Sequence, residues 1–275
     1  MWWREQMIML SEMLRDKKGF IFDLDGCIYL GDRPIPGASE TIGMLRKEGK
    51  KVLFLTNNST RTPQEYAQKL KGMGIEAGEG EVLTSSVATA MYLKRFGTGE
   101  CFVLGEQGLI QALEREGFKV LSAGEARGAR YVVCGLDMHL TYEKLAAACH
   151  AIQNGARFIA TNTDPRLPID GGYVPGAGSI VEAVATATGL RPLVIGKPSK
   201  RIMKIALKAM GLGGSEVAMV GDTLKIDIAA ARRAGITGVL VLSGSTRMED
   251  LEKSRIRPDA VIPSVAELQK AFSKK

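Results

Sequence analysis

The sequence predicts an α/β protein built on a mostly parallel sheet, in which one domain is interrupted by another. Apolar, strand-like runs alternate with segments of helical spacing along nearly the whole chain, a pattern typical of parallel sheets covered by helices. The alternation restarts near residue 85 and returns to its first style near residue 190. We therefore expect a discontinuous core domain over 1–83 and 191–275, with 1–17 as an N-terminal extension, and an inserted α/β domain over 84–190.

The stretch 19–29 is the one around which the rest of the chain is organised. An apolar run over 20–22 is long enough for a buried strand, and it ends on Asp23 and Asp25, followed by Gly26. Ligands bind beyond the carboxyl ends of the strands in a parallel sheet, so this acidic pair lies where chemistry is usually performed. Alone, an Asp-x-Asp-Gly sequence is explained as well by a turn, and only the downstream motifs favour a functional site.

The remaining elements of the first block follow in order. Helical spacing over 38–47 ends at Gly49, and an apolar run over 51–56 predicts a second buried strand that leads into Asn57 and Asn58. A helix is expected to start at Thr62, because a capping Thr, a Pro at the first helical position and a Glu three residues on are typical helix-start signals. A short third strand is predicted over 81–84.

The inserted block has three predicted strands, over 101–105, 131–135 and 157–162, with helical stretches between them. A Gly/Pro-rich segment over 170–178 closes this block before a helix that begins near Ser179. The first style then resumes with a strand-like run over 193–198 that contains Lys197. A helix follows it, then a strand over 217–220, an acidic loop over 221–227, a helix to Arg233 and a strand over 237–242.

Composition and charge exclude several classes of protein. The chain has 45% hydrophobic and 24% charged residues, as ordinary soluble proteins do. Its net charge of +7 would attract anions, but the basic residues are scattered with few aromatic residues between them, which does not favour nucleic-acid binding. No apolar segment approaches the roughly 20 residues of a membrane span. The apolar start over 1–10 makes a poor signal peptide and is interpreted as a helix on the sheet edge or as a subunit contact.

The cysteines and histidines indicate no metal site. The four cysteines are far apart, form no Cys-x-x-Cys pair, and are interpreted as free thiols in a reducing, cytoplasmic compartment. His139 and His150 have no ligand partner near them in the sequence, and we expect ordinary, partly buried histidines.

Four predicted strand ends carry polar groups that together fit phosphoryl transfer. They offer a carboxylate nucleophile, a proton donor, a hydroxyl and an amide for phosphoryl oxygens, a cation, and carboxylates for Mg²⁺. The motifs are Asp-Leu-Asp-Gly at 23–26, Thr-Asn-Asn at 56–58, Gly-Lys-Pro at 196–198 and Gly-Asp-Thr-Leu-Lys-Ile-Asp at 221–227. In this order they resemble the haloacid dehalogenase (HAD) superfamily of phosphatases, specifically the NagD/p-nitrophenylphosphatase-like subfamily. The resemblance runs from about residue 18 to the C-terminus.

The resemblance extends to the inserted block and implies a fold. The segments 160–165 and 175–179 look like parts of the C2-type cap of that subfamily. The expected architecture is thus a Rossmann-like, parallel-sheet HAD core with an inserted α/β cap domain. Cys27 and Ile226 occupy positions that often hold other residues, and neither departure removes a catalytic group.

Residue roles are also implied by the resemblance. Asp23 would be the nucleophile that forms an aspartyl-phosphate and Asp25 the general acid and base, with crowding by acids raising the Asp25 pKa. Lys197 would neutralise charge on Asp23 and the phosphoryl group. The expected ligands of Mg²⁺ are Asp23, the Asp25 backbone carbonyl and Asp222, with Asp227 and Gly221 in support. The expected substrate- and phosphate-binding residues are Thr56, Asn57 and Asn58 in the core motifs and Asn162, Asp164 and Arg166 in a loop of the inserted block.

The predicted function is therefore Mg²⁺-dependent hydrolysis of a small phosphorylated metabolite, with no nucleic-acid or membrane partner and a homodimer through the cap. A phosphotransferase or mutase would share every motif and differ by keeping water from the intermediate. A non-enzymatic phosphometabolite-binding protein is disfavoured because Asp23 and Asp25 are both present. A dinucleotide-dependent oxidoreductase lacks the required Gly-x-Gly-x-x-Gly after its first strand. Nucleotides, sugar phosphates, glycerol phosphates, phosphoglycolate and pyridoxal phosphate all remain open as substrates.

Overall fold

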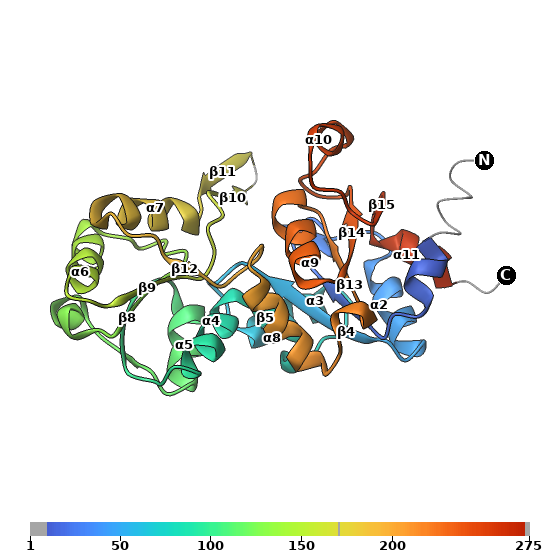
Figure 1. Cartoon of the computed structure of the whole chain (residues 1–275). Coiled ribbons are helices and arrows are strands. Elements are labelled where there is room, and N and C mark those ends of the chain that lie inside the picture. Colours follow the sequence, from blue (N-terminus) through green and yellow to red (C-terminus); the bar gives the residue numbers. More distant parts are fainter. Residues whose placement is uncertain (1–9, 170, 273–275) are drawn as a thin grey trace. The chain divides into compact units, whose positions relative to one another are not determined.

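The computed structural model describes residues 10–169 and 171–272, and the expectation for the chain start at 1–9 lies outside these residues. The described chain forms two compact units (Figure 1). Residues 10–56, 66–83 and 203–272 belong to the first unit, and residues 57–65 and 84–202 belong to the second. The second unit thus also contains 57–65 and 191–202, whereas the expected boundaries near 84 and 190 stay a prediction.

The first unit is built on a six-stranded sheet with the order β15-β14-β13-β1-β4-β5. The pairings of β1 with β13 and β4, of β13 with β14 and of β14 with β15 are parallel, which confirms the predicted α/β class. β1 lies between β13 and β4, and all four of its residues are buried. The strands are β1 (Gly19–Phe22), β4 (Lys51–Thr56), β5 (Val82–Thr84), β13 (Val217–Gly221), β14 (Thr237–Val241) and β15 (Ala260–Ile262).

Alternate residues of these strands fill the core on one face of the sheet. Phe22 pairs in register with Phe54 on one side and Val220 on the other, and all three belong to one buried apolar cluster. Successive side chains of a strand point to opposite faces of the sheet. Runs such as 20–22 are apolar throughout because both faces of this sheet are covered. Leu224 and Ile228 form a smaller cluster with Leu240.

Helices and short elements complete the first unit. The helices that lie wholly in it are α2 (Ala38–Lys47), α9 (Ala229–Ala234), α10 (Met248–Lys253) and α11 (Leu268–Phe272). The first three residues of α3 (Pro63–Gly72) and of α8 (Lys200–Met210) belong to the second unit, and the rest of each helix belongs to the first. β2 (Tyr29–Leu30) and β3 (Arg33–Pro34) form a two-stranded hairpin. The predicted helix start at Thr62 is confirmed, because its N–H donates to Glu65 Oε2 at 2.7 Å while its hydroxyl accepts from the N–H of Glu65 at 3.2 Å.

The second unit has its own five-stranded sheet, with the order β12-β9-β8-β6-β7. Its strands are β6 (Glu100–Leu104), β7 (Lys119–Val120), β8 (Tyr131–Cys134), β9 (Arg157–Ala160) and β12 (Leu193–Val194), and every pairing is parallel. The helices are α4 (Ser85–Lys94), α5 (Gln107–Arg115), α6 (Tyr142–Gln153) and α7 (Ala177–Thr188). Buried alanines and aliphatic side chains of α6 and α7 pack against Phe102, Val132 and Phe158 of this sheet.

Several expectations for the second unit are wrong. The strand expected over 193–198 spans only Leu193–Val194, and it pairs with β9 of the second unit instead of resuming the first sheet. The Gly/Pro-rich segment is not only a loop, because β10 (Arg166–Ile169) and β11 (Gly172–Pro175) pair as an antiparallel hairpin. His139 and His150 are exposed, not partly buried.

The cysteines and the lengths of the helices bear on two further expectations. All four cysteines are free, as predicted. No helix among residues 10–169 and 171–272 combines the length and apolar character needed to cross a bilayer.

Candidate active site

Three of the predicted site residues lie at one edge of the first sheet. Asp23 follows β1, Asp222 follows β13, and Thr56 is the last residue of β4. Because these three parallel strands are neighbours in the order β13-β1-β4, their carboxyl ends meet at the same edge. The N–H of Asp23 donates to the carbonyl oxygen of Val220 at 2.9 Å, which extends the strand pairing up to the first carboxylate.

Asp23, Asp222 and Asp227 form a compact acidic group. One carboxylate oxygen from each of them lies within 4.8 Å of the others. Asp227 is brought there by a π-helical turn over Leu224–Ile228. Its N–H donates to the carbonyl of Thr223 at 2.9 Å, and its Oδ2 accepts from the N–H of Thr223 at 3.0 Å. Asp227, which was expected only to support the site, therefore belongs to the acidic group together with Asp222 of the same motif.

Glycines allow the backbone to approach these carboxylates closely. Gly26 has a positive φ of 78°, and a Cβ there would lie 2.6 Å from Asp222 Oδ2. A Cβ at Gly221 would overlap the side chain of Asp227. Both positions accept only glycine without rearrangement, which gives the glycines of the two motifs a steric reason.

The loop after β14 is a part of the site that the sequence did not reveal. The N–H of Ser245 donates to Asp222 Oδ2 at 2.6 Å, and Ser243 Oγ donates to the carbonyl oxygen of Gly26 at 2.7 Å. A Cβ at Gly244 would overlap Asp222. This loop contacts Asp222 through a backbone N–H and Gly26 through a serine hydroxyl. The available signal was only a run of small residues after a predicted strand.

Burial raises the pKa of two of these carboxyl groups. For Asp222, desolvation raises the pKa most and the nearby Asp227 charge raises it further, while hydrogen bonds from Ser245 and Thr223 lower it. For Asp25, desolvation again raises the pKa, and the Lys69 ammonium and the N–H of Gly26 lower it. The direction expected for Asp25 is confirmed, although burial is its leading cause. A carboxyl group with a raised pKa can hold a proton for transfer. The three clustered carboxyl groups of Asp23, Asp222 and Asp227 offer oxygen ligands to a cation.

The other predicted residues belong to the second unit, where Asn57 is the centre of a hydrogen-bond network. Its Nδ2 donates to Asp164 Oδ2 and to the carbonyl oxygen of Lys197, both at 2.9 Å. Its Oδ1 accepts from the N–H of Lys197 at 2.8 Å. Asn162 Nδ2 donates to the carbonyl oxygen of Asn57 at 2.7 Å, and Asn162 Oδ1 accepts from the N–H of Asp164 at 3.0 Å. The structure thus brings two of the three predicted loop residues, Asn162 and Asp164, together with Asn57 and Lys197.

Asn58 and Arg166 have different surroundings. Asn58 Oδ1 accepts from the N–H and the hydroxyl of Thr60, at 3.0 and 2.8 Å, and so shapes the turn after Asn57. Arg166 is exposed at the start of β10, with its guanidinium carbon 4.3 Å from the centre of the Tyr173 ring on the paired strand β11. This cation–π contact belongs to the hairpin.

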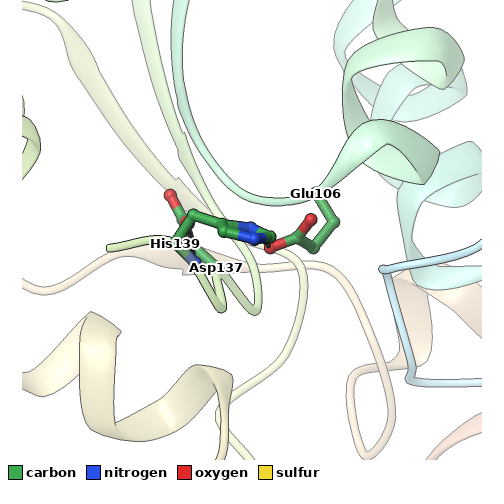
Figure 2. A group of neighbouring side chains, drawn as sticks. All are labelled: Glu106, Asp137 and His139. Carbon is green, nitrogen blue, oxygen red and sulfur yellow. Dashed lines mark hydrogen bonds and ion pairs between the residues drawn. The ribbon is translucent and has the colours of Figure 1, made fainter. Parts of the chain in front are cut away.

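A second group in the described residues has the spacing of a metal site. Glu106, Asp137 and His139 each offer a ligand atom within 4.8 Å of the others, and Figure 2 shows their side chains converging. However, Lys144 Nζ donates to both Asp137 oxygens, at 2.9 and 3.2 Å. Glu106 Oε1 already accepts from Met138 N at 2.7 Å and lies 3.1 Å from His139 Nδ1. Because Lys144 neutralises the buried Asp137 carboxylate, these contacts favour a structural role over a metal centre. Glu106, Asp137, His139 and Lys144 connect the loops that follow β6 and β8, and we call this set the loop clamp.

Comparison with known proteins identifies the family. Residues 20–119 match the family described as haloacid dehalogenase-like hydrolase, and residues 194–268 match a HAD-hydrolase-like family. The 5'-nucleotidase YutF of Bacillus subtilis is 40% identical over 92% of this chain and 98% of its own length. The chain belongs to the haloacid dehalogenase-like hydrolases.

Further relatives of this HAD hydrolase agree with the predicted subfamily. An acid sugar phosphatase of Staphylococcus saprophyticus is 40% identical over 95% of this chain and 100% of its own length. The solved p-nitrophenyl phosphatase of Archaeoglobus fulgidus has a TM-score of 0.88 at 38% identity and covers 94% of this chain and 100% of that one. NagD from E. coli K-12 has a TM-score of 0.85 at 32% identity and covers 91% and 98%. The predicted HAD fold, subfamily and enzyme class, a HAD-type phosphatase, are confirmed.

Proposed function

We propose that this HAD hydrolase is a Mg²⁺-dependent phosphomonoesterase that acts on a small phosphorylated metabolite through an aspartyl-phosphate. The observation that carries the proposal is the convergence of Asp23 and Asp222, at the carboxyl ends of the adjacent strands β1 and β13, with Asp227 of the turn that follows. The raised pKa of Asp25, two residues after the proposed nucleophile, suits a proton donor.

The donor set of the acidic group fits Mg²⁺. Its side chains offer oxygen atoms only, which a hard cation such as Mg²⁺ prefers. We assign the ion to Asp23, Asp222 and the backbone carbonyl of Asp25, with Asp227 orienting a bound water or Lys197. When bound, the ion would reduce repulsion between the carboxylates and the phosphoryl oxygens.

In the first proposed step, a carboxylate oxygen of Asp23 attacks phosphorus while the phosphorus–ester oxygen bond breaks. Asp25 gives its proton to the leaving alkoxide, so that the alcohol departs neutral and Asp23 carries the phosphoryl group. In the second step, the Asp25 carboxylate takes a proton from water, the water oxygen bonds to phosphorus, and the Asp23–phosphorus bond breaks. Inorganic phosphate leaves, and Asp25 is protonated again for the next cycle.

Groups with hydrogen-bond donors or positive charge would hold the phosphoryl oxygens during both steps. We assign this role to the Thr56 hydroxyl, the backbone N–H of Asn57 and the Lys197 ammonium, with Asn58 shaping the loop that presents them. The support is the position of Thr56 at the edge that bears Asp23 and the resemblance of the Thr-Asn-Asn and Gly-Lys-Pro motifs to the family pattern.

The test is Mg²⁺-dependent release of inorganic phosphate by the full chain, first from p-nitrophenyl phosphate and then from a panel of nucleotides, sugar phosphates and other phosphometabolites. Added acceptor alcohols distinguish hydrolysis from phosphoryl transfer, because a phosphotransferase would form a new phosphate ester in place of inorganic phosphate. The names of the relatives, a 5'-nucleotidase and an acid sugar phosphatase, justify placing nucleotides and sugar phosphates first in the panel.

Substrate choice is proposed to depend on Asn162, Asp164 and Arg166. Groups that meet only the variable part of a substrate alter selectivity more than they alter activity toward a generic ester. For Asp164→Ala we expect the kcat/KM of the best panel substrate, divided by that of p-nitrophenyl phosphate, to fall about tenfold or more. An unchanged ratio would show that this loop does not select the substrate.

A further inference from the structure

We infer that the side chain of Asn57 is a positioning group for Lys197, which it holds by its backbone and links to Asp164. The inference deepens the proposed function and rests on it, because Lys197 is the proposed phosphoryl-neutralising cation. It differs from the expected role of Asn57 as a phosphate ligand, which needs only the backbone N–H.

The amide of Asn57 pairs with both backbone groups of one residue. Oδ1 accepts from Lys197 N at 2.8 Å, and Nδ2 donates to Lys197 O at 2.9 Å. Two hydrogen bonds of opposite direction fix the orientation of the lysine backbone as well as its position. Asn57 and Lys197 are both buried, so the two bonds pair polar groups that are removed from water.

The second hydrogen of the amide nitrogen connects the lysine to the predicted substrate loop. Nδ2 donates to Asp164 Oδ2 at 2.9 Å, in addition to its bond with Lys197 O. A primary amide nitrogen has two hydrogens, and both are therefore used within the second unit. The Asn57 side chain has no donor left for a phosphoryl oxygen, which argues for positioning over direct phosphate binding.

The chain before Lys197 is shaped to admit the Asn57 amide. A Cβ at Gly196 would lie 2.7 Å from Asn57 Oδ1 and 3.2 Å from Asn162 Cβ, and it would also overlap the carbonyl oxygen of Thr161. Only a residue without a side chain fits between these groups. This steric observation is independent of the hydrogen bonds and indicates the same close packing of the lysine segment around Asn57.

A double-mutant cycle between Asn57→Ala and Lys197→Ala tests the inference, with p-nitrophenyl phosphate as substrate. Because a small misplacement of a catalytic group can cost about 100-fold, we expect Asn57→Ala to lower kcat by about that factor. We expect KM to change by no more than about twofold, because the group acts on the transition state. In the Lys197→Ala background, Asn57→Ala should cost no more than about twofold, since the group that it positions is already absent.

Equal losses in both backgrounds would overturn the inference, as would a raised KM with unchanged kcat. The exposed Asn154→Ala, in the same unit, is the matched control and should leave kcat and KM unchanged. If Lys197→Ala itself retains wild-type activity, the proposed function fails in its use of the lysine. A Lys197→Ala defect with an additive Asn57→Ala defect would overturn only the positioning role.

Asn57→Asp provides a second variant that does not depend on tolerance of a cavity. It keeps the acceptor for Lys197 N, loses both donors, and brings a second carboxylate to Asp164. Adding Asp164→Asn returns a donor to that contact, so the double variant should recover at least about threefold of the kcat lost by Asn57→Asp. Thermal unfolding confirms that each variant is folded. Absence of any recovery, with both variants folded, would overturn the link to Asp164.

Discussion

The two units of the molecule each place acidic side chains after parallel strands, but the described contacts of the two groups differ. Asp23 and Asp222 follow β1 and β13 of the first sheet, and Glu106 and Asp137 follow β6 and β8 of the second. Both groups satisfy the same 4.8 Å spacing. In the first, Asp227 adds a further negative charge that raises the pKa of Asp222. In the second, Lys144 forms an ion pair with Asp137 at 2.9 Å.

This difference teaches that spacing at a strand end does not by itself define a metal centre. The contacts that each carboxylate already makes must be considered together with the spacing. In the second group the buried Asp137 carboxylate also accepts from the N–H of His139 at 2.9 Å, which adds to its two contacts with Lys144. We therefore propose chemistry for the strand-end position of the first sheet and a structural role for that of the second.

The largest expected effect is that of Asp23→Asn. The proposed nucleophile loses its charge and its ability to form the phosphoenzyme, so kcat should fall by about four orders of magnitude or more while the fold is retained. Glu106→Gln is the matched control from the second group and should keep wild-type activity. Acid-quenched peptide mapping of the phosphoenzyme provides the measurement. A phosphoryl group found on any residue other than Asp23 would refute the assignment.

The next largest expected effect is on metal affinity, which should depend on the Asp23, Asp222 and Asp227 group and not on the Glu106, Asp137 and His139 group. Asp222→Asn should weaken Mn²⁺ binding, measured by calorimetry or electron paramagnetic resonance, by about 10–100-fold or more. His139→Ala should leave the affinity unchanged, because we assign no ion to the second group. Excess chelator should abolish phosphate release, and Mg²⁺ should restore it. If the second variant loses affinity and the first does not, the two groups have been assigned the wrong way round.

The loop clamp should matter for stability and not for catalysis. Lys144→Met leaves the carboxylate of Asp137, whose side chain is 1% exposed, without its ammonium partner. Because the lysine is partly solvated, we expect a loss of about 1–3 kcal/mol in the free energy of unfolding, below the range for a fully buried pair. Urea denaturation gives this value, and adding Asp137→Asn should recover part of it. A fall in kcat of the folded Lys144→Met protein would contradict a purely structural role.

The smallest expected effect is a pH-dependent gain in stability from Asp222→Asn in metal-free protein. Folding raises the pKa of Asp222, so its favourable contribution is complete below the unfolded pKa near 4 and is lost as pH rises through the folded value. The neutral amide avoids that loss, and its two ends can still bond Ser245 N–H and Thr223. We expect a gain on the order of 1 kcal/mol at pH 7 and none below about pH 4. A gain that is the same at both pH values would exclude this cause.

The sequence predicts the parts of the fold that depend on local pattern. The buried run that ends at Asp23 and the run that ends before Asp222 are strands in the structure, and their order brings the two carboxylates together. The capping signal at Thr62 also predicts the correct helix start. Each of these features is encoded within a few neighbouring residues, so that no distant partner is needed to recognise it.

Features that depend on distant partners could not be predicted in this way. β12 has only two residues, and its pairing with β9 decides which sheet it joins. The hairpin of β10 and β11 contains prolines and glycines that are typical of loops, and prolines are tolerated in such strands when they lie at an edge. The contacts of Asn57 with Lys197 join residues 140 positions apart. Spacing in the sequence contains no information about such pairs.

The place of β1 in its sheet also has a consequence for how the protein is made. β4 follows β1 closely in the chain, whereas β13, which pairs Val220 with Phe22, is synthesised about 200 residues later. A nascent chain therefore presents one open edge of its central strand while the whole second unit emerges from the ribosome, and non-local pairing of this kind is slow. Asp23 meets Asp222 and Asp227 only when that edge is closed. Chains that stop before Asp222 consequently carry the proposed nucleophile without its acidic partners, and the proposed hydrolysis requires synthesis through Asp227.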